Sequence, residues 1–309
     1  MYTADFAYAR AGSLAGALEL LAAAQARGED VKLLAGGQSL LPMMKLRLAA
    51  PETLIDIGGV GELKGVTGGP AEGAEGAKTV IGALTTYREL ERDPMITATF
   101  PAMADALAVL ADSQVRARGT IGGCIAHADP ASDLPAVLLA LDATVTIAGG
   151  HGTREALLDD FLTGIYSTDL ADDEIITAIT VPAAPPGQAY EKFPQPASHL
   201  PLAGACAAVE IKDGTICRAG VAVTGVASRP YRPRDTERIL ASAPLTPSLL
   251  ASAAAQAGGA EQGGDVRPLS DQHASGPYRL HLAEIMTLRA LQRAVERASG
   301  NSSGKAGER

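Results

Sequence analysis

Two glycine pairs stand where the chain could hold an anion, and the first is the segment Ala35-Gly36-Gly37-Gln38-Ser39. It separates an apolar run, typical of a buried strand, from a stretch with helical character. Unpaired N–H groups at the start of a helix attract phosphate, and glycine lets a backbone approach it closely. A tight turn that needs only small residues is the alternative. A single Gly-Gly pair does not decide between them.

The second pair lies in the segment Thr120-Ile121-Gly122-Gly123-Cys124, inside a long irregular stretch of a kind that is often functional. Arg116 and Arg118 precede it and could face either a diphosphate or solvent. Asp133 follows it and could accept hydrogen bonds from ribityl or ribose hydroxyls, or cap the helix that begins after it. Two such cradles, distant in sequence, suit a long diphosphate cofactor held between subdomains.

The elements that must position these segments follow from capping residues and apolar periodicity. A helix after Ser13, a strand at 31–35, a helix at 39–48 and a strand at 53–57 predict a small parallel sheet. The stretch at 115–135 has no regular period. Further strands are expected at 79–83, 143–148, 174–181, 203–211 and 217–226, and further helices at 87–91, 101–112, 136–141 and 278–298. Thr86 and Glu89 have the spacing of a capping box before the helix at 87–91, and "KDG" at 212–214 is a hairpin signal between the last two strands. The last helix carries one apolar face, formed by Ala283, Met286, Ala290, Leu291 and Ala294.

This order of elements predicts an α+β fold in three parts. We expect an N-terminal α/β subdomain at 1–58 and a second subdomain at 59–182. The proline-rich linker after residue 182 then leads to a sheet-and-helix subdomain at 183–299. The polar tail at 300–309 is expected to be disordered.

Composition narrows the possible functions of the 309-residue chain. Its formal net charge of −9 argues against a nucleic-acid binder, which needs a basic surface. No apolar run is long enough to span a bilayer and the N-terminus lacks the features of a signal peptide, so we expect a cytoplasmic protein without a transmembrane segment. Three scattered cysteines and five histidines form no metal-ligand motif, so no metal site is expected.

The two glycine segments resemble those of a known family. "LLAGGQSLLPMMKLRLAAPETLIDI" and "RGTIGGCIAHADPASDLPAVLLAL" are similar to the FAD-binding medium subunits of molybdenum hydroxylases, above all the carbon monoxide dehydrogenase type and more distantly the xanthine dehydrogenase flavin domain. The likeness continues through "VIGALTTYREL", "FLTGIYSTDL", "YEKF" and "YRLHLAEIMTLRALQRAV". The resemblance implies a vanillyl-alcohol-oxidase-type fold, with FAD between two α/β subdomains and a C-terminal three-stranded antiparallel sheet with helices.

The resemblance also implies which residues bind FAD. Ala35 to Ser39 would wrap the diphosphate, and Thr120 to Gly123 would contact the diphosphate and the flavin. Asp133 matches the family's acidic residue after the second segment. Leu170 would lie near the adenine or the flavin edge, and Lys192 near the flavin ring, where an ammonium group could stabilise negative charge.

Two positions depart from the family pattern. Cys124 stands where asparagine is common, and the second segment keeps its glycines beside it. A buried, inert thiol or a thiol near the flavin are both compatible with this position. Gln38 stands where histidine is frequent in the carbon monoxide enzyme, which leaves the substrate open.

The function implied by the resemblance is electron transfer by an oxidoreductase flavoprotein subunit that has no catalytic residues of its own. An iron–sulfur small subunit and a large subunit with a molybdenum cofactor would complete a heterotrimer. Electrons would leave through FAD to an external acceptor. A stand-alone flavoprotein oxidase or reductase of the same fold and a non-catalytic nucleotide-binding assembly factor are the alternatives.

Overall fold

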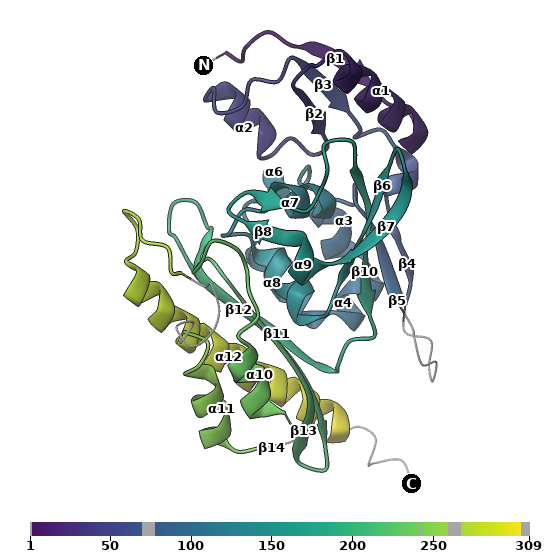
Figure 1. Ribbon diagram of the computed structural model, residues 1–309. Coiled ribbons are helices and arrows are strands. Elements are labelled where there is room, and N and C mark those ends of the chain that lie inside the picture. The colour runs from purple at the N-terminus through teal and green to yellow at the C-terminus, as the bar shows by residue number, and fades with distance from the viewer. Residues whose placement is uncertain (1, 70–77, 242, 259–266, 304–309) are drawn as a thin grey trace.

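A computed structural model describes residues 2–69, 78–241, 243–258 and 267–303 of the chain (Figure 1). The elements form an N-terminal lobe at the top of Figure 1, a second subdomain in the middle, and a sheet covered by a long helix at the bottom. The mixed α+β fold expected from the sequence is confirmed. None of the helices in these ranges is both long and apolar enough to cross a membrane.

The N-terminal lobe is built on a parallel sheet of order β1-β3-β2. Arg10 and Leu34, which end β1 and β2, both align with Asp56, which ends β3, so the three carboxyl ends meet at one edge. The Ser13 hydroxyl accepts the Gly16 N–H and caps α1, as predicted. The elements are β1 (Ala7–Arg10), α1 (Leu14–Ala26), β2 (Val31–Leu34), α2 (Leu40–Lys45) and β3 (Thr53–Asp56).

Strand β1 was not predicted. It has four residues, alanine fills two of them, and its side chains are mostly exposed, so it carries no apolar alternation. Its pairing with β3 holds it in the sheet.

The second subdomain has an antiparallel sheet of order β4-β5-β10-β6-β7, with helices packed against it. The predicted capping box is present, because Thr86 and Glu89 exchange side-chain-to-backbone hydrogen bonds at the start of α3. The elements are η1 (Gly61–Leu63), β4 (Val66–Gly68), β5 (Lys78–Gly82), α3 (Tyr87–Arg92), α4 (Pro94–Thr99), α5 (Pro101–Val109), α6 (Ser113–Arg116), α7 (Ile121–His127), α8 (Asp133–Ala140), β6 (Thr144–Gly149), β7 (Gly152–Leu157), α9 (Leu158–Phe161), β8 (Leu162–Gly164), β9 (Ser167–Thr168) and β10 (Ile175–Pro182).

The stretch at 115–135 is more regular than predicted, because it contains the end of α6, all of α7 and the start of α8. Asp112 and Thr120 cap α6 and α7 with their side chains. Tertiary packing supports these short helices: Ile121, Ile125 and Leu134 are fully buried in the largest core. Their apolar positions are too few for periodicity to reveal.

The C-terminal subdomain is an antiparallel sheet of order β11-β12-β13-β14, in which three long strands carry a short fourth. The predicted hairpin turn is present, with positive φ at Asp213 and Gly214. The elements are β11 (Gly187–Pro194), β12 (Pro201–Lys212), β13 (Thr215–Thr224), α10 (Arg234–Leu240), β14 (Ala243–Pro244), α11 (Pro247–Ala254) and α12 (Gly276–Ser303).

Helix α12 lies across β11 and β12 and buries the predicted apolar face. That face comprises Ala283, Met286, Ala290, Leu291 and Ala294, all within the core of this subdomain. The helix continues to Ser303, so the first residues of the predicted tail are helical. The rest of the tail, 304–309, lies outside the described residues.

Candidate functional site

The two glycine segments, far apart in the chain, are in direct contact. A Cβ on Gly36 would lie 2.1 Å from the carbonyl oxygen of Arg118 and 3.0 Å from Cα of Gly119, so only glycine fits there. A Cβ on Gly123 would lie 3.9 Å from that of Ala35. The contact joins the carboxyl edge of the N-terminal sheet to the start of α7, and makes one site of two segments.

The first segment offers unpaired donors at this contact. Within the described residues, the N–H groups from Gly36 to Leu40 have no hydrogen-bond acceptor, whereas the next one, of Leu41, bonds to the Gly37 carbonyl. Gly37 has φ of +76°, and a left-handed residue in such a turn can direct successive N–H groups into one concavity. The segment is half-buried and therefore accessible, with the Gln38 side chain exposed and Ser39 making no side-chain cap. These donors fit a pyrophosphate.

The second segment has a different construction. It is the first turn of α7, and four of its N–H groups donate within the chain, from Ile121 to the Thr85 carbonyl, from Gly122 to the Ala83 carbonyl, from Gly123 to the Thr120 hydroxyl and from Cys124 to the Thr120 carbonyl. A Cβ on Gly122 would lie 2.5 Å from Cβ of Ala83. Its glycines therefore let α7 pack tightly, and the segment fixes the position of the helix and of Arg118 beside the first segment.

Asp133 and Lys192, two of the residues predicted to bind the cofactor, form an ion pair with each other. The Lys192 ammonium lies 3.0 Å from Oδ1 of Asp133, and their side chains are 3% and 4% exposed. The Tyr190 hydroxyl donates to the same oxygen at 2.7 Å. Burial raises the pKa of Asp133, and the Lys192 charge and the Tyr190 hydrogen bond oppose that rise. This cluster ties α8 of the second subdomain to β11 of the C-terminal sheet.

The remaining predicted residues border the same core. Leu170 and Cys124 are both half-buried against the core of the second subdomain that holds Ile121 and Ile125. Arg116 is not available to a ligand, because its guanidinium donates to the carbonyls of Leu110 and Ala111 and pairs with Glu91. The sequence left open whether Arg116 and Arg118 face a diphosphate or solvent. The structure shows that Arg116 bonds within the chain, whereas Arg118 is exposed.

Iodoacetamide is expected to alkylate Cys217 well before Cys124 near neutral pH. Burial raises the pKa of the Cys124 thiol to about 11, while Cys217 is exposed, and the thiolate is the reactive form. Because this pKa lies far above neutral, the Cys124 thiolate fraction should rise about tenfold per pH unit. Peptide mass spectrometry after timed quenching measures both rates, with the fully buried Cys206 as the unreactive control. Equal rates for Cys124 and Cys217 would contradict the prediction.

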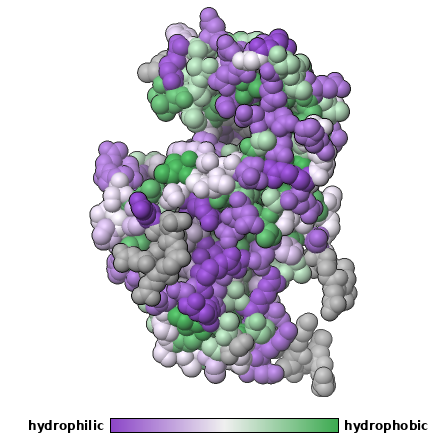
Figure 2. Space-filling view, in the orientation of Figure 1, coloured by the Kyte–Doolittle hydropathy of each residue, from purple (hydrophilic) through white to green (hydrophobic). Residues whose placement is uncertain are grey.

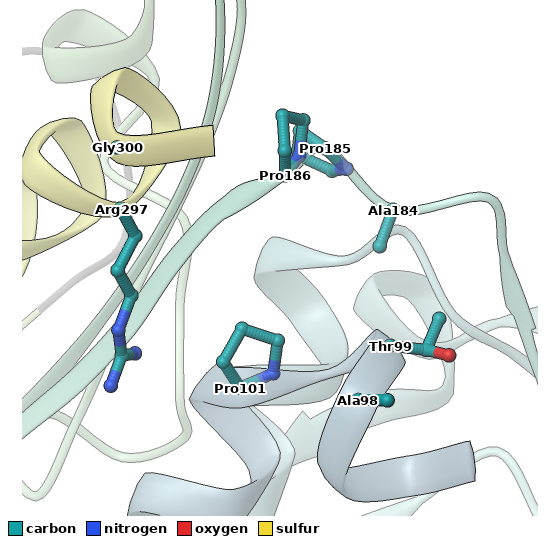
Figure 3. A pocket seen from close by; sticks show the side chains of 8 residues that line it. All are labelled: Ala98, Thr99, Pro101, Ala184, Pro185, Pro186, Arg297 and Gly300. Carbon is teal, nitrogen blue, oxygen red and sulfur yellow. The ribbon is translucent and has the colours of Figure 1, made fainter. Parts of the chain in front are cut away.

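A hollow of about 530 Å³ lies elsewhere, where the 183–186 linker passes between α5 and the end of α12 (Figure 3). Its lining includes Thr99, Pro101, Pro185 and Arg297 and contains none of the predicted cofactor residues. Arg297 is already held by Asp105 and by the Gln188 carbonyl. The hollow therefore lies at a junction of subdomains, and the guanidinium of Arg297 in its lining is already engaged by other groups of the protein.

Two protein families match this chain in succession. The family described as "FAD binding domain in molybdopterin dehydrogenase" matches residues 4–184, which include both glycine segments. The family described as "CO dehydrogenase flavoprotein C-terminal domain" matches residues 188–294. The chain belongs to the FAD-binding medium subunits of the molybdopterin dehydrogenases. Within them it is of the carbon monoxide dehydrogenase medium-chain type, and the predicted family and FAD cofactor are confirmed.

Relatives match this medium subunit over nearly its whole length. The carbon monoxide dehydrogenase medium chain of Afipia carboxidovorans is 35% identical, over 96% of this chain and 99% of the relative. The glyceraldehyde dehydrogenase medium chain of Sulfolobus acidocaldarius is 34% identical, over 94% and 99%. A solved structure of carbon monoxide dehydrogenase from Hydrogenophaga pseudoflava aligns with a TM-score of 0.88 at 37% identity, over 96% of this chain and 99% of that one.

Sequence reasoning missed three features of the candidate site of this medium subunit. Arg10 and the turn at Gly58 and Gly59 share the carboxyl edge with the first glycine segment, but this edge is visible only once β1 is in the sheet. Tyr190 holds Asp133, and a signal for it was available. Residues two apart on a strand face the same side, so Tyr190 and Lys192 of "YEKF" had to share a face.

Proposed function

We propose that this chain is the electron-transfer subunit of a multisubunit molybdenum hydroxylase in the cytoplasm. It would receive electrons from the iron–sulfur clusters of a small subunit and pass them through FAD to an external acceptor. A large subunit with a molybdenum cofactor would oxidise the substrate and complete the heterotrimer. The observation that carries the proposal is the contact between Gly36 and Arg118, which brings the two family segments together and would make one FAD site of them.

The chain's own residues would bind and orient the cofactor. The segment Ala35–Ser39 would hold the pyrophosphate with its free N–H groups, which begin at Gly36, and Thr120–Cys124 would fix the position of α7 beside it. Leu170 would cover an edge of the cofactor, and the Asp133–Lys192 pair would close the flavin end with a buried ammonium group that favours negative charge. FAD supplies the redox chemistry when bound.

The substrate of the complex would be chosen by the large subunit. Relatives of similar identity carry names with different substrates, carbon monoxide and glyceraldehyde, although they match this chain from end to end. The carbon monoxide dehydrogenase type of this chain therefore describes its sequence similarity and fold, and we propose no particular substrate.

Co-purification with the products of neighbouring genes tests the proposal. We expect the tagged chain to carry flavin absorbance in a complex with two other chains. We also expect that absorbance to bleach under anaerobic conditions only when the complex holds its iron–sulfur and molybdenum subunits and meets its substrate. Turnover of a small substrate by the chain alone would instead support a stand-alone flavoenzyme. A chain that binds no FAD, alone or in the complex, would support an assembly factor.

A further inference from the structure

The N-terminal lobe, residues 2–60, has few polar attachments to the rest of the molecule. Across the described residues, no hydrogen bond or ion pair joins this lobe to residues 78–303. The attachment consists of apolar contacts, in which Leu84 and Ile175 enter the core of the lobe, of the backbone contact at Gly36, and of the hydrogen bond that the Leu14 N–H donates to Glu62 in η1. The space-filling view shows a notch on one side of this seam (Figure 2).

Two exposed arginines stand on opposite sides of the seam. Arg10 ends β1 in the lobe, and its guanidinium lies against Gly59, 3.1 Å from the position of a Cβ there. Arg118 belongs to the second subdomain, and its backbone touches Gly36. Neither guanidinium has a hydrogen-bond acceptor or an ion-pair partner within the described residues. Most other arginines that line subdomain junctions, such as Arg232 and Arg293, are paired.

A carboxylate, that of Asp56, lies at the same edge. Asp56 ends β3, its carboxylate accepts from the Tyr8 hydroxyl and the Gly58 N–H, and Gly58 lies beside the Ala35 carbonyl. Burial raises its pKa, but these hydrogen bonds and the charges of Arg10 and Arg118 outweigh burial and hold the pKa below its ordinary value. Two cations and one carboxylate leave a net positive charge where three strands end and ligands of parallel sheets bind.

We propose that Arg10 and Arg118 bind the pyrophosphate of FAD from opposite sides of the seam, so that the cofactor fastens the N-terminal lobe to the second subdomain. The inference rests on the proposed function only in taking FAD as the ligand. A pyrophosphate carries two charges, and guanidinium groups bind such oxygens with directed pairs of donors. The glycine segment supplies N–H groups between them, and the cations supply the charge that those N–H groups lack.

The test compares FAD binding by chain freed of flavin, alone and in complex with its partner chains. Arg10→Gln and Arg118→Gln should each weaken FAD binding about tenfold, as for one charge-assisted hydrogen bond. The affinity of each variant should also fall less steeply with added salt than that of the wild type. The FAD affinity of Arg118→Lys should lie between that of Arg118→Gln and that of the wild type. Arg289→Gln, which removes an exposed arginine on α12, should bind as the wild type does.

Hydrogen exchange tests the fastening itself. ADP-ribose, which carries the pyrophosphate without the flavin, should slow amide exchange at residues 35–40 and 57–60 in the wild type, and riboflavin should not. At the same ADP-ribose concentration, Arg10→Gln and Arg118→Gln should show little protection. Equal FAD affinity and salt dependence in all variants would overturn the role of the arginines while leaving FAD binding intact. A wild-type complex that binds no FAD would overturn both this inference and the proposed function.

Discussion

Replacing Gly36 with valine is expected to weaken FAD binding by at least about 100-fold. The new side chain would start 2.1 Å from the Arg118 carbonyl oxygen, which is backbone and cannot rotate away. The two glycine segments would have to separate, which would move the free N–H groups from Gly36 to Leu40 away from the second segment. The affinity is lost because two parts of the protein are pushed apart, and the valine need not touch the cofactor. Flavin fluorescence titration measures the FAD affinity of the variant.

Gly12→Val is the matched control for this substitution. Gly12 lies in the same lobe, and a Cβ there would meet no atom within 4 Å. We expect its FAD affinity to match that of the wild type. Circular dichroism should show both variants folded, because the C-terminal subdomain has its own core. If Gly36→Val binds FAD normally, the contact between the two segments does not shape the site.

Removing one member of the Asp133–Lys192 pair is expected to lower the free energy of unfolding by about 3–5 kcal/mol. In Lys192→Met the Asp133 carboxylate stays buried with only the Tyr190 hydroxyl as side-chain partner, and in Asp133→Asn the ammonium group is buried without a counter-charge. The double variant Asp133→Asn/Lys192→Met removes both charges and should recover most of the loss. Urea denaturation of all four proteins completes the cycle.

Lys212→Met is the control for the loss of a lysine in an ion pair. Lys212 pairs with Glu210 at the surface, where its side chain is 70% exposed, so little change in stability is expected. Additive losses in the double variant would mean that the two buried groups do not depend on each other. The flavin absorbance spectrum of the double variant shows whether the pair also acts on the flavin ring. An unchanged spectrum means that the pair is purely structural, and a changed spectrum means that it acts on the ring.

The seam between the lobe and the second subdomain connects the first prediction with the role of the arginines. Within the described residues, apolar contacts through Leu84 and Ile175 hold the seam with few hydrogen bonds across it, so we expect the lobe to adjust its position at small cost. A ligand that binds both sides adds its binding energy to the seam. Cofactor loading should therefore stabilise the N-terminal lobe more than the C-terminal sheet.

The sequence by itself determined the elements whose signals are local. Ser13, the Thr86–Glu89 capping box and the Asp213-Gly214 turn each satisfy or direct the backbone within a few residues, so their patterns could be interpreted without a fold. The apolar face of α12 and the family resemblance of the two glycine segments are also patterns that can be recognised in the sequence without a fold.

Only the tertiary structure decided how these parts form a site. It showed that the glycines of 120–124 serve helix packing, whereas those of 35–39 leave N–H groups free. It paired Asp133 with Lys192, fixed Arg116 within the chain and left Arg118 exposed at the seam. Spacing along a chain constrains neighbours a few residues apart. The partner of a buried charge or an unpaired donor is set instead by which distant strands and helices meet, and folding alone brings those together.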